Sequence, residues 1–355
     1  MRVATQDIWS FLPKNVRNRL LLGGDGQTRL LSIAESLMSA LDASPHAETL
    51  INVFRDMTLA AWELDFCDAR ASAVLCQVQE QIPFLPPATA AFAKTAAKAR
   101  PARPEDAATL SALYKSGDVA EIKKFLEQRR AAEPGNLFWL RFALGLGFQA
   151  WDLDWREGWL DHPGLPPAFR ALAAADQSFA RGDWQAALNG YADAFALTAL
   201  PGLLAKQAES LLRLGERERA LALLTDAALR RPWQNSLLFR ATDLVAGWDV
   251  PGEPPPGKGR ILLYSWNHAP DLDICLRALA ESALGDCRLA LLDNGSTDAT
   301  PAVAAAWRDK LGERLALVTL PVNVGAPAAR NWLLSFDEAK SADWVVFLDD
   351  DAVVP

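Results

Sequence analysis

Two kinds of hydrophobic pattern divide the sequence. Up to about residue 249, apolar residues recur three and four positions apart, as at Ile33, Leu37 and Leu41, which is the period of amphipathic helices. From residue 259 onward, short continuous apolar runs alternate with helical patterns. Continuous apolar strands separated by helices predict a parallel sheet covered on both faces. The patterns therefore predict a multidomain protein, with an all-α N-terminal part and an α/β C-terminal part.

Proline and glycine mark the predicted boundaries. The segment VPGEPPPGKGR, residues 250–260, has four prolines and three glycines, which interrupt both helices and strands. A second break occurs where Pro101 and Pro104 interrupt an alanine-rich helical pattern. The predicted organisation is a helical N-terminal region at 1–100, helical repeats at 105–249, a linker at 250–258 and an α/β domain at 259–355.

The second helical region repeats with a period of about 34 residues. The matching positions are Gly182 and Gly215, Ala187 and Ala220, Ala194 and Ala227, and the closing prolines Pro201 and Pro232. A glycine between two helices, small residues where they cross and a final proline resemble the tetratricopeptide repeat (TPR). A looser copy has Gly117 and Pro134 at matching places, but Ile122 and Arg129 where small residues are expected. Stacked hairpins offer an extended surface, which serves either to dock a protein partner or as a spacer.

Composition narrows the classes of function. The chain has 355 residues, 50% of them hydrophobic, and a net charge of −8 without a basic run, which argues against a nucleic-acid partner. It contains no long uncharged apolar stretch and no signal-peptide core at its start, so we expect no transmembrane segment. We expect a cytoplasmic protein, or one bound peripherally at the inner membrane face. The cysteines and histidines lack the close spacing of zinc ligands.

Candidate chemistry lies at the carboxyl ends of the four predicted strands, where parallel sheets bind ligands. The polar segments there are YSWN (264–267), DNGSTD (293–298), NVG (323–325) and DDD (349–351). The sequence has neither the glycine fingerprint of dinucleotide binding nor a phosphate loop. Carboxylates at a strand end can hold a hard divalent cation that neutralises a diphosphate. The apolar run before DDD predicts a buried strand that ends at these three aspartates.

The ordered set YSWN, LLDNGSTDAT, NVGAPAARN and FLDDDAVVP resembles the family-2 glycosyltransferases, which have the GT-A fold. The resemblance covers residues 259–355. It implies a metal-dependent, inverting transfer of sugar from a nucleotide-diphosphate donor to a glycan or protein acceptor, as in polysaccharide biosynthesis. It also implies Mn²⁺ or Mg²⁺ as cofactor, with Asp349, Asp350 and Asp351 as ligands.

The same resemblance implies roles for single residues. Asp293 would accept a hydrogen bond from the base, with Trp266 or Tyr264 packed nearby. Gly325 would permit close backbone approach, and Arg330 would contact the nucleotide or be a surface charge. The expected nucleotide-binding residues are Tyr264, Ser265, Trp266, Asn267, Asp293, Gly295, Ser296, Gly325, Arg330, Asp349 and Asp350.

The sequence departs from that family at its end. In these enzymes an acceptor half follows the aspartate loop and supplies the catalytic base, whereas here only AVVP follows. No residue can therefore be assigned as the base, and we expect an incomplete α/β domain, either a fragment of a longer transferase or a truncation that keeps donor binding. The alternative function is a TPR-type interaction scaffold with a vestigial transferase domain.

Overall fold

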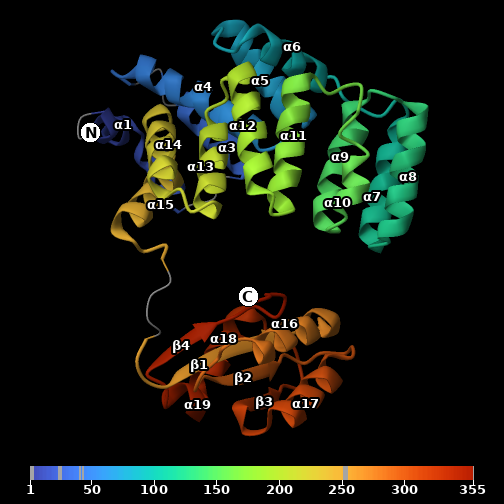
Figure 1. Cartoon of the computed structure of the whole chain (residues 1–355), viewed down its shortest axis with the longest axis vertical. Helices are drawn as coiled ribbons and strands as arrows, with labels where there is room; N and C mark the ends of the chain where they lie inside the picture. Colours follow the sequence, from blue (N-terminus) through green and yellow to red (C-terminus); the bar gives the residue numbers. More distant parts are fainter. Residues whose placement is uncertain (1–3, 23–25, 40, 42–43, 251–254, 355) are drawn as a thin grey trace. The chain divides into compact units, whose positions relative to one another are not determined.

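The structure, a computed structural model, describes residues 4–22, 26–39, 41, 44–250 and 255–354. The chain divides into two compact units, Met1–Val250 and Pro251–Pro355, and each is described by itself (Figure 1). Residues 251–254 of the predicted linker lie outside the described residues.

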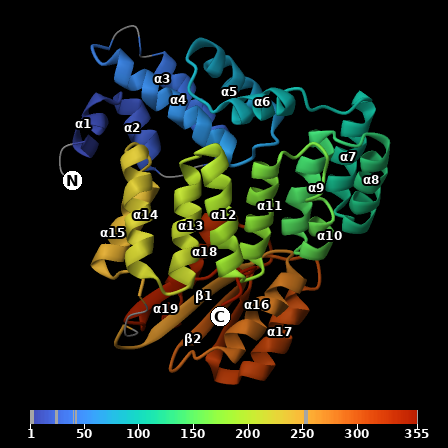
Figure 2. The same cartoon turned by 45° about the horizontal axis from the view of Figure 1, so that its top comes forward.

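Helices make up the first unit. Its N-terminal helices are α1 (Ala4–Phe11), α2 (Lys14–Leu21), α3 (Gln27–Met38), α4 (Ala47–Glu63), α5 (Ala69–Gln81) and α6 (Pro87–Ala96). The helices that follow are α7 (Pro104–Ser116), α8 (Val119–Ala132), α9 (Leu137–Gln149), α10 (Leu153–Glu157), α11 (Pro167–Ala180), α12 (Trp184–Thr198), α13 (Gly202–Arg213), α14 (Arg217–Arg230) and α15 (Asn235–Ala246). Figures 1 and 2 show α11 to α14 as a row of neighbouring helices, which pack pairwise in chain order.

The predicted TPR-like hairpins are confirmed in this row. Gly182 joins α11 to α12 and Gly215 joins α13 to α14, and both have a φ of 79°, which glycine adopts without strain. Small residues lie where α11 and α12 cross, because a Cβ added at Gly190 would come within 2.9 Å of the Cβ of Ala175. The small residues therefore let α11 and α12 pack closely against each other.

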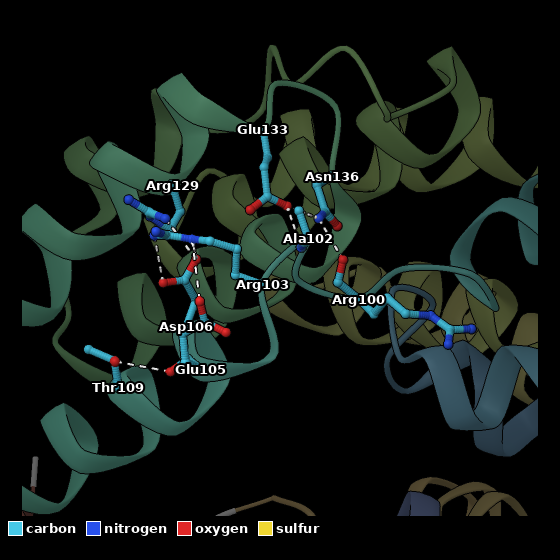
Figure 3. Close-up of polar contacts among 9 residues, drawn as sticks. All are labelled: Arg100, Ala102, Arg103, Glu105, Asp106, Thr109, Arg129, Glu133 and Asn136. Carbon is cyan, nitrogen blue, oxygen red and sulfur yellow. Dashed lines mark hydrogen bonds and ion pairs between the residues drawn. The ribbon is translucent and has the colours of Figure 1, made fainter.

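The looser repeat, α7 with α8, crosses differently. Arg129, at a position where a small residue was expected, extends to α7 and binds Asp106 at 2.7 Å (Figure 3). Arg103 donates two further hydrogen bonds to the same carboxylate, at 3.1 and 3.0 Å. Burial acts to raise the pKa of Asp106, but the hydrogen bonds from the two arginines outweigh it, so the pKa lies below its usual value. An ion pair thus replaces the contact between small side chains.

The two helical regions predicted at 1–100 and 105–249 share one core. Trp62 of α4 is fully buried and packs edge-on against Phe92 of α6 and Phe169 of α11, with ring centroids 6.3 and 5.6 Å apart. Near the end of α14, the buried Arg231 pairs with Glu63 at 2.6 Å. Aromatic packing and a buried ion pair therefore join α4 to the repeats.

The second unit is a parallel sheet with helices. Its elements are β1 (Gly259–Ser265), α16 (Ala269–Glu281), β2 (Arg288–Asp293), α17 (Thr300–Leu311), the 3-10 turn η1 (Gly312–Arg314), β3 (Leu315–Thr319), α18 (Ala326–Ser335), α19 (Asp337–Lys340) and β4 (Trp344–Phe347). The strand order is β3-β2-β1-β4, and all three pairings are parallel. The predicted parallel α/β architecture is confirmed.

Alternate residues of the central strands face opposite helices. Leu263 and Leu291 pack in the core formed with α16 and α17, whereas Leu262 and Leu292 pack in the core formed with α18 and α19. Because successive side chains of a strand point to opposite faces, a continuous apolar run fills both cores at once.

The expectation of a buried strand before the three aspartates is wrong. In the described chain β4 is the edge strand beside β1, and Val345, Val346 and Phe347 are 37%, 46% and 38% exposed. Hydrophobicity shows that a run is strand-like, but the order of strands decides whether neighbours cover it. The aspartates accordingly follow an edge strand.

Candidate functional site

The four polar loops meet at the carboxyl edge of the sheet. The order in which strands are added to the sheet reverses beside β1: the chain leads from β1 through α16 to β2 on one side, whereas β4 lies on the other side of β1. Ligands of open parallel sheets bind at such a switch point. A contact across it joins Ser265, the last residue of β1, to Asp350. The site therefore centres on the ends of β1 and β4.

The loop after β2 presents one buried carboxylate. Asp293 is 1% exposed, and its Oδ1 accepts a hydrogen bond from the backbone N–H of Ser296 at 3.1 Å. Its Oδ2 is buried and has no hydrogen-bond partner in the described protein. A buried carboxylate oxygen without a donor is costly, so Asp293 is suited to accept a hydrogen bond from a ligand.

Gly295 allows this loop to lie against the loop after β3. Its φ is 72°, and a Cβ at this position would lie 2.4 Å from the carbonyl carbon of Val322 and 2.6 Å from the backbone nitrogen of Asn323. Only glycine fits both the backbone angle and the space. Gly325 also has a positive φ, 83°, but open space where its Cβ would be. Gly325 thus serves the backbone turn into α18, and no atom of the described residues other than its chain neighbours comes within 4 Å of its Cβ position.

Asn294 joins the second and third loops. It is 1% exposed, its Nδ2 donates to Oδ1 of Asn323 at 2.9 Å, and its Oδ1 accepts from the N–H of Val324 at 3.0 Å. The same Oδ1 of Asn323 accepts from the N–H of Gly325 at 2.7 Å. This role of Asn294 is not predicted from the sequence, although Asn294 lies within the DNGSTD segment. Its partners are about thirty residues away, so no local pattern marks it.

The first loop is fastened to the second through Asn267. This residue has a φ of 55°, which asparagine tolerates better than most residues. Its Oδ1 accepts from the N–H of Thr297 at 2.8 Å, and its N–H donates to Oγ of Ser296 at 3.0 Å. Asn267 and Ser296 therefore position backbone, whereas the neighbouring Trp266 is 47% exposed and available for stacking.

The two leading aspartates of the last loop have different partners. Asp350, with 15% of its side chain exposed, accepts from Oγ of Ser265 at 2.5 Å and has Nδ1 of His268 at 3.7 Å. Asp349, with 63% of its side chain exposed, pairs with Nη2 of Arg330 at 3.0 Å. Ser265, expected to bind nucleotide, is fully buried beneath Asp350, and so its hydroxyl orients that carboxylate.

Cys275 of α16 makes a hydrogen bond to the loop that contains the three aspartates. Its buried thiol donates to the carbonyl oxygen of Asp349 at 3.7 Å. Burial, followed by the charges of Asp350 and Asp351, raises the pKa of Cys275 to about 11. The group therefore stays a thiol and a hydrogen-bond donor at neutral pH. Sequence spacing gave no sign of this contact.

The aspartate loop fits a divalent cation that is shared with a ligand. In the described chain, no three His, Cys, Asp or Glu side chains converge to form a metal cage. Mg²⁺ commonly takes one or two carboxylates from the protein and its other ligands from phosphate and water. Asp350 is held in place by Ser265, and Asp351 is exposed beside it. The donor set is hard oxygen, as such a cation requires.

The C-terminal unit is thus a parallel α/β sheet with aspartates at the carboxyl edge of its strands. Residues 261–355 match the family model described as glycosyl transferase family 2. The expected GT-A class of the C-terminal part is thereby confirmed. No curated protein matches the chain.

Solved structures are similar to parts of the chain. The mannosyltransferase PcManGT from Pyrobaculum calidifontis, in complex with GDP-Man and Mn²⁺, is 22% identical over 39% of this chain and 40% of its own, with a TM-score of 0.28. The Cut9–Hcn1 hetero-tetramer of APC/C is 11% identical over 67% and 46%, with a TM-score of 0.31. Yeast Tom70 is 12% identical over 64% and 61%, with a TM-score of 0.26. The chain thus covers less than two thirds of the length of each.

Proposed function

We propose that the C-terminal unit binds a nucleotide-diphosphate sugar and takes part in metal-dependent, inverting transfer of the sugar to a glycan or protein acceptor. The family match supports a glycosyltransferase. The observation that carries donor binding is Asp293, whose buried Oδ2 lacks a donor at the edge where the aspartate loop lies. A nucleobase N–H would supply the missing hydrogen bond.

We expect different residues to contact the base and the diphosphate of the donor. Asp293 would read the base edge, and the exposed Trp266 would stack near the base. The guanidinium of Arg330 lies 5.5 Å from the centroid of the Tyr264 ring, and we expect it to contact the diphosphate. Ser296 and Asn267 keep the two loops together around the nucleotide. We assign no catalytic base.

A divalent cation would be held by Asp350 with Asp349 or Asp351. When bound, Mn²⁺ or Mg²⁺ neutralises the charge that develops on the diphosphate as the sugar leaves. The contribution of the chain is to orient Asp350 through Ser265, so that the carboxylate is placed before the ligand arrives.

We also propose that the helical unit binds a protein partner. Four helices, α9, α11, α12 and α13, line a mostly apolar hollow of about 500 Å³, whose lining includes Phe148, Phe179 and Tyr191 together with Asp176, Lys206 and Glu209. An apolar floor with a charged border suits a peptide with mixed side chains. None of the helices in the described part of the chain is long and apolar enough to cross a membrane.

Donor binding is tested by calorimetry with a panel of nucleoside diphosphates in Mn²⁺. We expect Asp293→Ala to weaken the preferred nucleotide about tenfold or more, because a hydrogen bond to a charged acceptor is lost. The matched control is Asp309→Ala, which removes an exposed carboxylate paired with Arg308 in the same unit. Equal nucleotide affinity in wild type and Asp293→Ala would refute the role of Asp293.

A further inference from the structure

The adjacent residues Asp349 and Asp350 have different partners, because only Asp349 pairs with an arginine. The hydroxyl of Ser265 donates to Asp350 at 2.5 Å and Nδ1 of His268 lies 3.7 Å from the same carboxylate, so Asp350 is held in place without an arginine or lysine beside it. Arg330 pairs with Asp349 at 3.0 Å, so the charge of this neighbour is neutralised within the protein. A divalent cation that approached the free loop would therefore meet Asp350 held in place and Asp349 already paired with Arg330.

The Arg330 side chain is held on one side and open on the other. Its guanidinium lies over the rings of Tyr264 and Phe347, with centroid distances of 5.5 and 5.9 Å. The side chain of Arg330 is 44% exposed and that of Asp349 is 63% exposed. Ion pairs this exposed contribute little net stability, so a competing anion can displace the carboxylate easily.

We infer that Arg330 is an internal counter-ion of Asp349, which keeps divalent cations weakly bound until a diphosphate draws the guanidinium away. This inference rests on the proposed function, because it assumes that a diphosphate occupies the site. It goes further by assigning the order of events at the loop. Asp349 becomes a cation ligand only after Arg330 has moved to the phosphates.

Charge balance explains why the exchange is favourable. Guanidinium matches phosphate oxygens in a bidentate way and gains shorter, charge-assisted hydrogen bonds there. Asp349 would then be free to hold a divalent cation, which would neutralise charge on the same diphosphate. The pair thus couples cation binding to donor binding.

The test is Arg330→Gln in the full chain, titrated with Mn²⁺ alone and followed by the paramagnetic resonance signal of free Mn²⁺. We expect affinity for Mn²⁺ without nucleotide to rise about threefold to fivefold, the scale of one exposed ion pair. In the presence of Mn²⁺, the same variant should bind the nucleoside diphosphate more weakly than wild type. Opposite changes in the two affinities are the signature of a displaced counter-ion.

The matched control is Arg277→Gln on α16, which removes one positive charge from an exposed pair with Asp273 in the same unit. It should change neither affinity, and Arg330→Gln combined with Asp349→Asn should lose the gain in Mn²⁺ binding. Unchanged or lower Mn²⁺ affinity in Arg330→Gln, with unchanged thermal unfolding, would overturn the inference. That result stands apart from a failure of the proposed function, in which wild type itself would not bind a nucleoside diphosphate.

Discussion

Gly295 offers a sharp test of how the site is built. In Gly295→Ala, the new methyl group meets two difficulties at once, a φ of 72° and backbone atoms of Val322 and Asn323 at 2.4–2.6 Å. The left-handed backbone costs about 1–2 kcal/mol for a residue with a Cβ. Overpacking adds about 1–3 kcal/mol, since backbone atoms cannot turn aside as a flexible side chain can. We therefore expect the C-terminal unit to lose about 2–5 kcal/mol of unfolding free energy.

The comparison with Gly285 isolates the close approach. Gly285, in the turn between α16 and β2, also has a positive φ, 53°, but nothing lies within 4 Å of its Cβ position. Gly285→Ala should cost only the backbone term, about 1–2 kcal/mol. Urea unfolding of the full chain, read by hydrogen exchange of the β1 and β2 amides, separates this unit from the helical one.

Nucleotide binding is a second measurement that should distinguish Gly295→Ala from Gly285→Ala. Gly295→Ala must push the third loop away from the second, and so it should also weaken nucleoside diphosphate binding, whereas Gly285→Ala should not. If both variants lose the same stability and bind alike, the contact between the loops does not organise the site, and the reasoning fails.

Three further changes test other parts of the account. Trp62→Ala should destabilise the helical unit by about 3–5 kcal/mol in urea unfolding, because it leaves a large cavity in the core. The control Trp248→Ala, at a side chain that is 75% exposed, should change the unfolding free energy by less than about 0.5 kcal/mol. The pKa of Asp106 is lowered, so its stabilising effect is present above the ordinary carboxylate pKa and is lost as pH falls through the depressed value. Asp106→Asn should therefore lower the melting temperature at pH 7, and the melting temperature of this variant should fall less than that of wild type between about pH 5 and pH 2.5. Asn294→Ala should cost about 1–3 kcal/mol in the α/β unit, since it leaves the N–H of Val324 without its acceptor, and equal urea midpoints for variant and wild type would contradict this.

The sequence predicts strand identity well because strands here are local apolar runs. The run RLALLD coincides with β2, and the run LALVTL contains β3 with one residue to spare. The hairpins of α11 to α14 were found from glycines and alanines whose spacing is imposed by the turn and the crossing. These signals are local, and each is tied to one backbone requirement.

Tertiary order could not be read in the same way. The exposure of β4 follows from its place beside β1 alone, which no residue in its own sequence encodes. Ser265 was expected to bind nucleotide, but it is buried and its hydroxyl donates to Asp350, 85 residues away, so its burial could not be predicted from the local sequence. Arg129 resembled a poor repeat position, yet its length lets it reach Asp106 across the hairpin. In each example a long-range partner determines the role.

The central claim is that the aspartate loop binds nucleotide and cation together. Calorimetry of the full chain with a nucleoside diphosphate, in excess Mn²⁺ and in chelator, tests it most directly. We expect Mn²⁺ to raise the affinity about tenfold or more, the scale of a coupling of about 1–3 kcal/mol. Replacing Asp349 and Asp351 with alanine should abolish this dependence, whereas Asp154→Ala, at an exposed carboxylate of the helical unit, should leave it unchanged. Equal binding in chelator and in excess Mn²⁺ would contradict the claim.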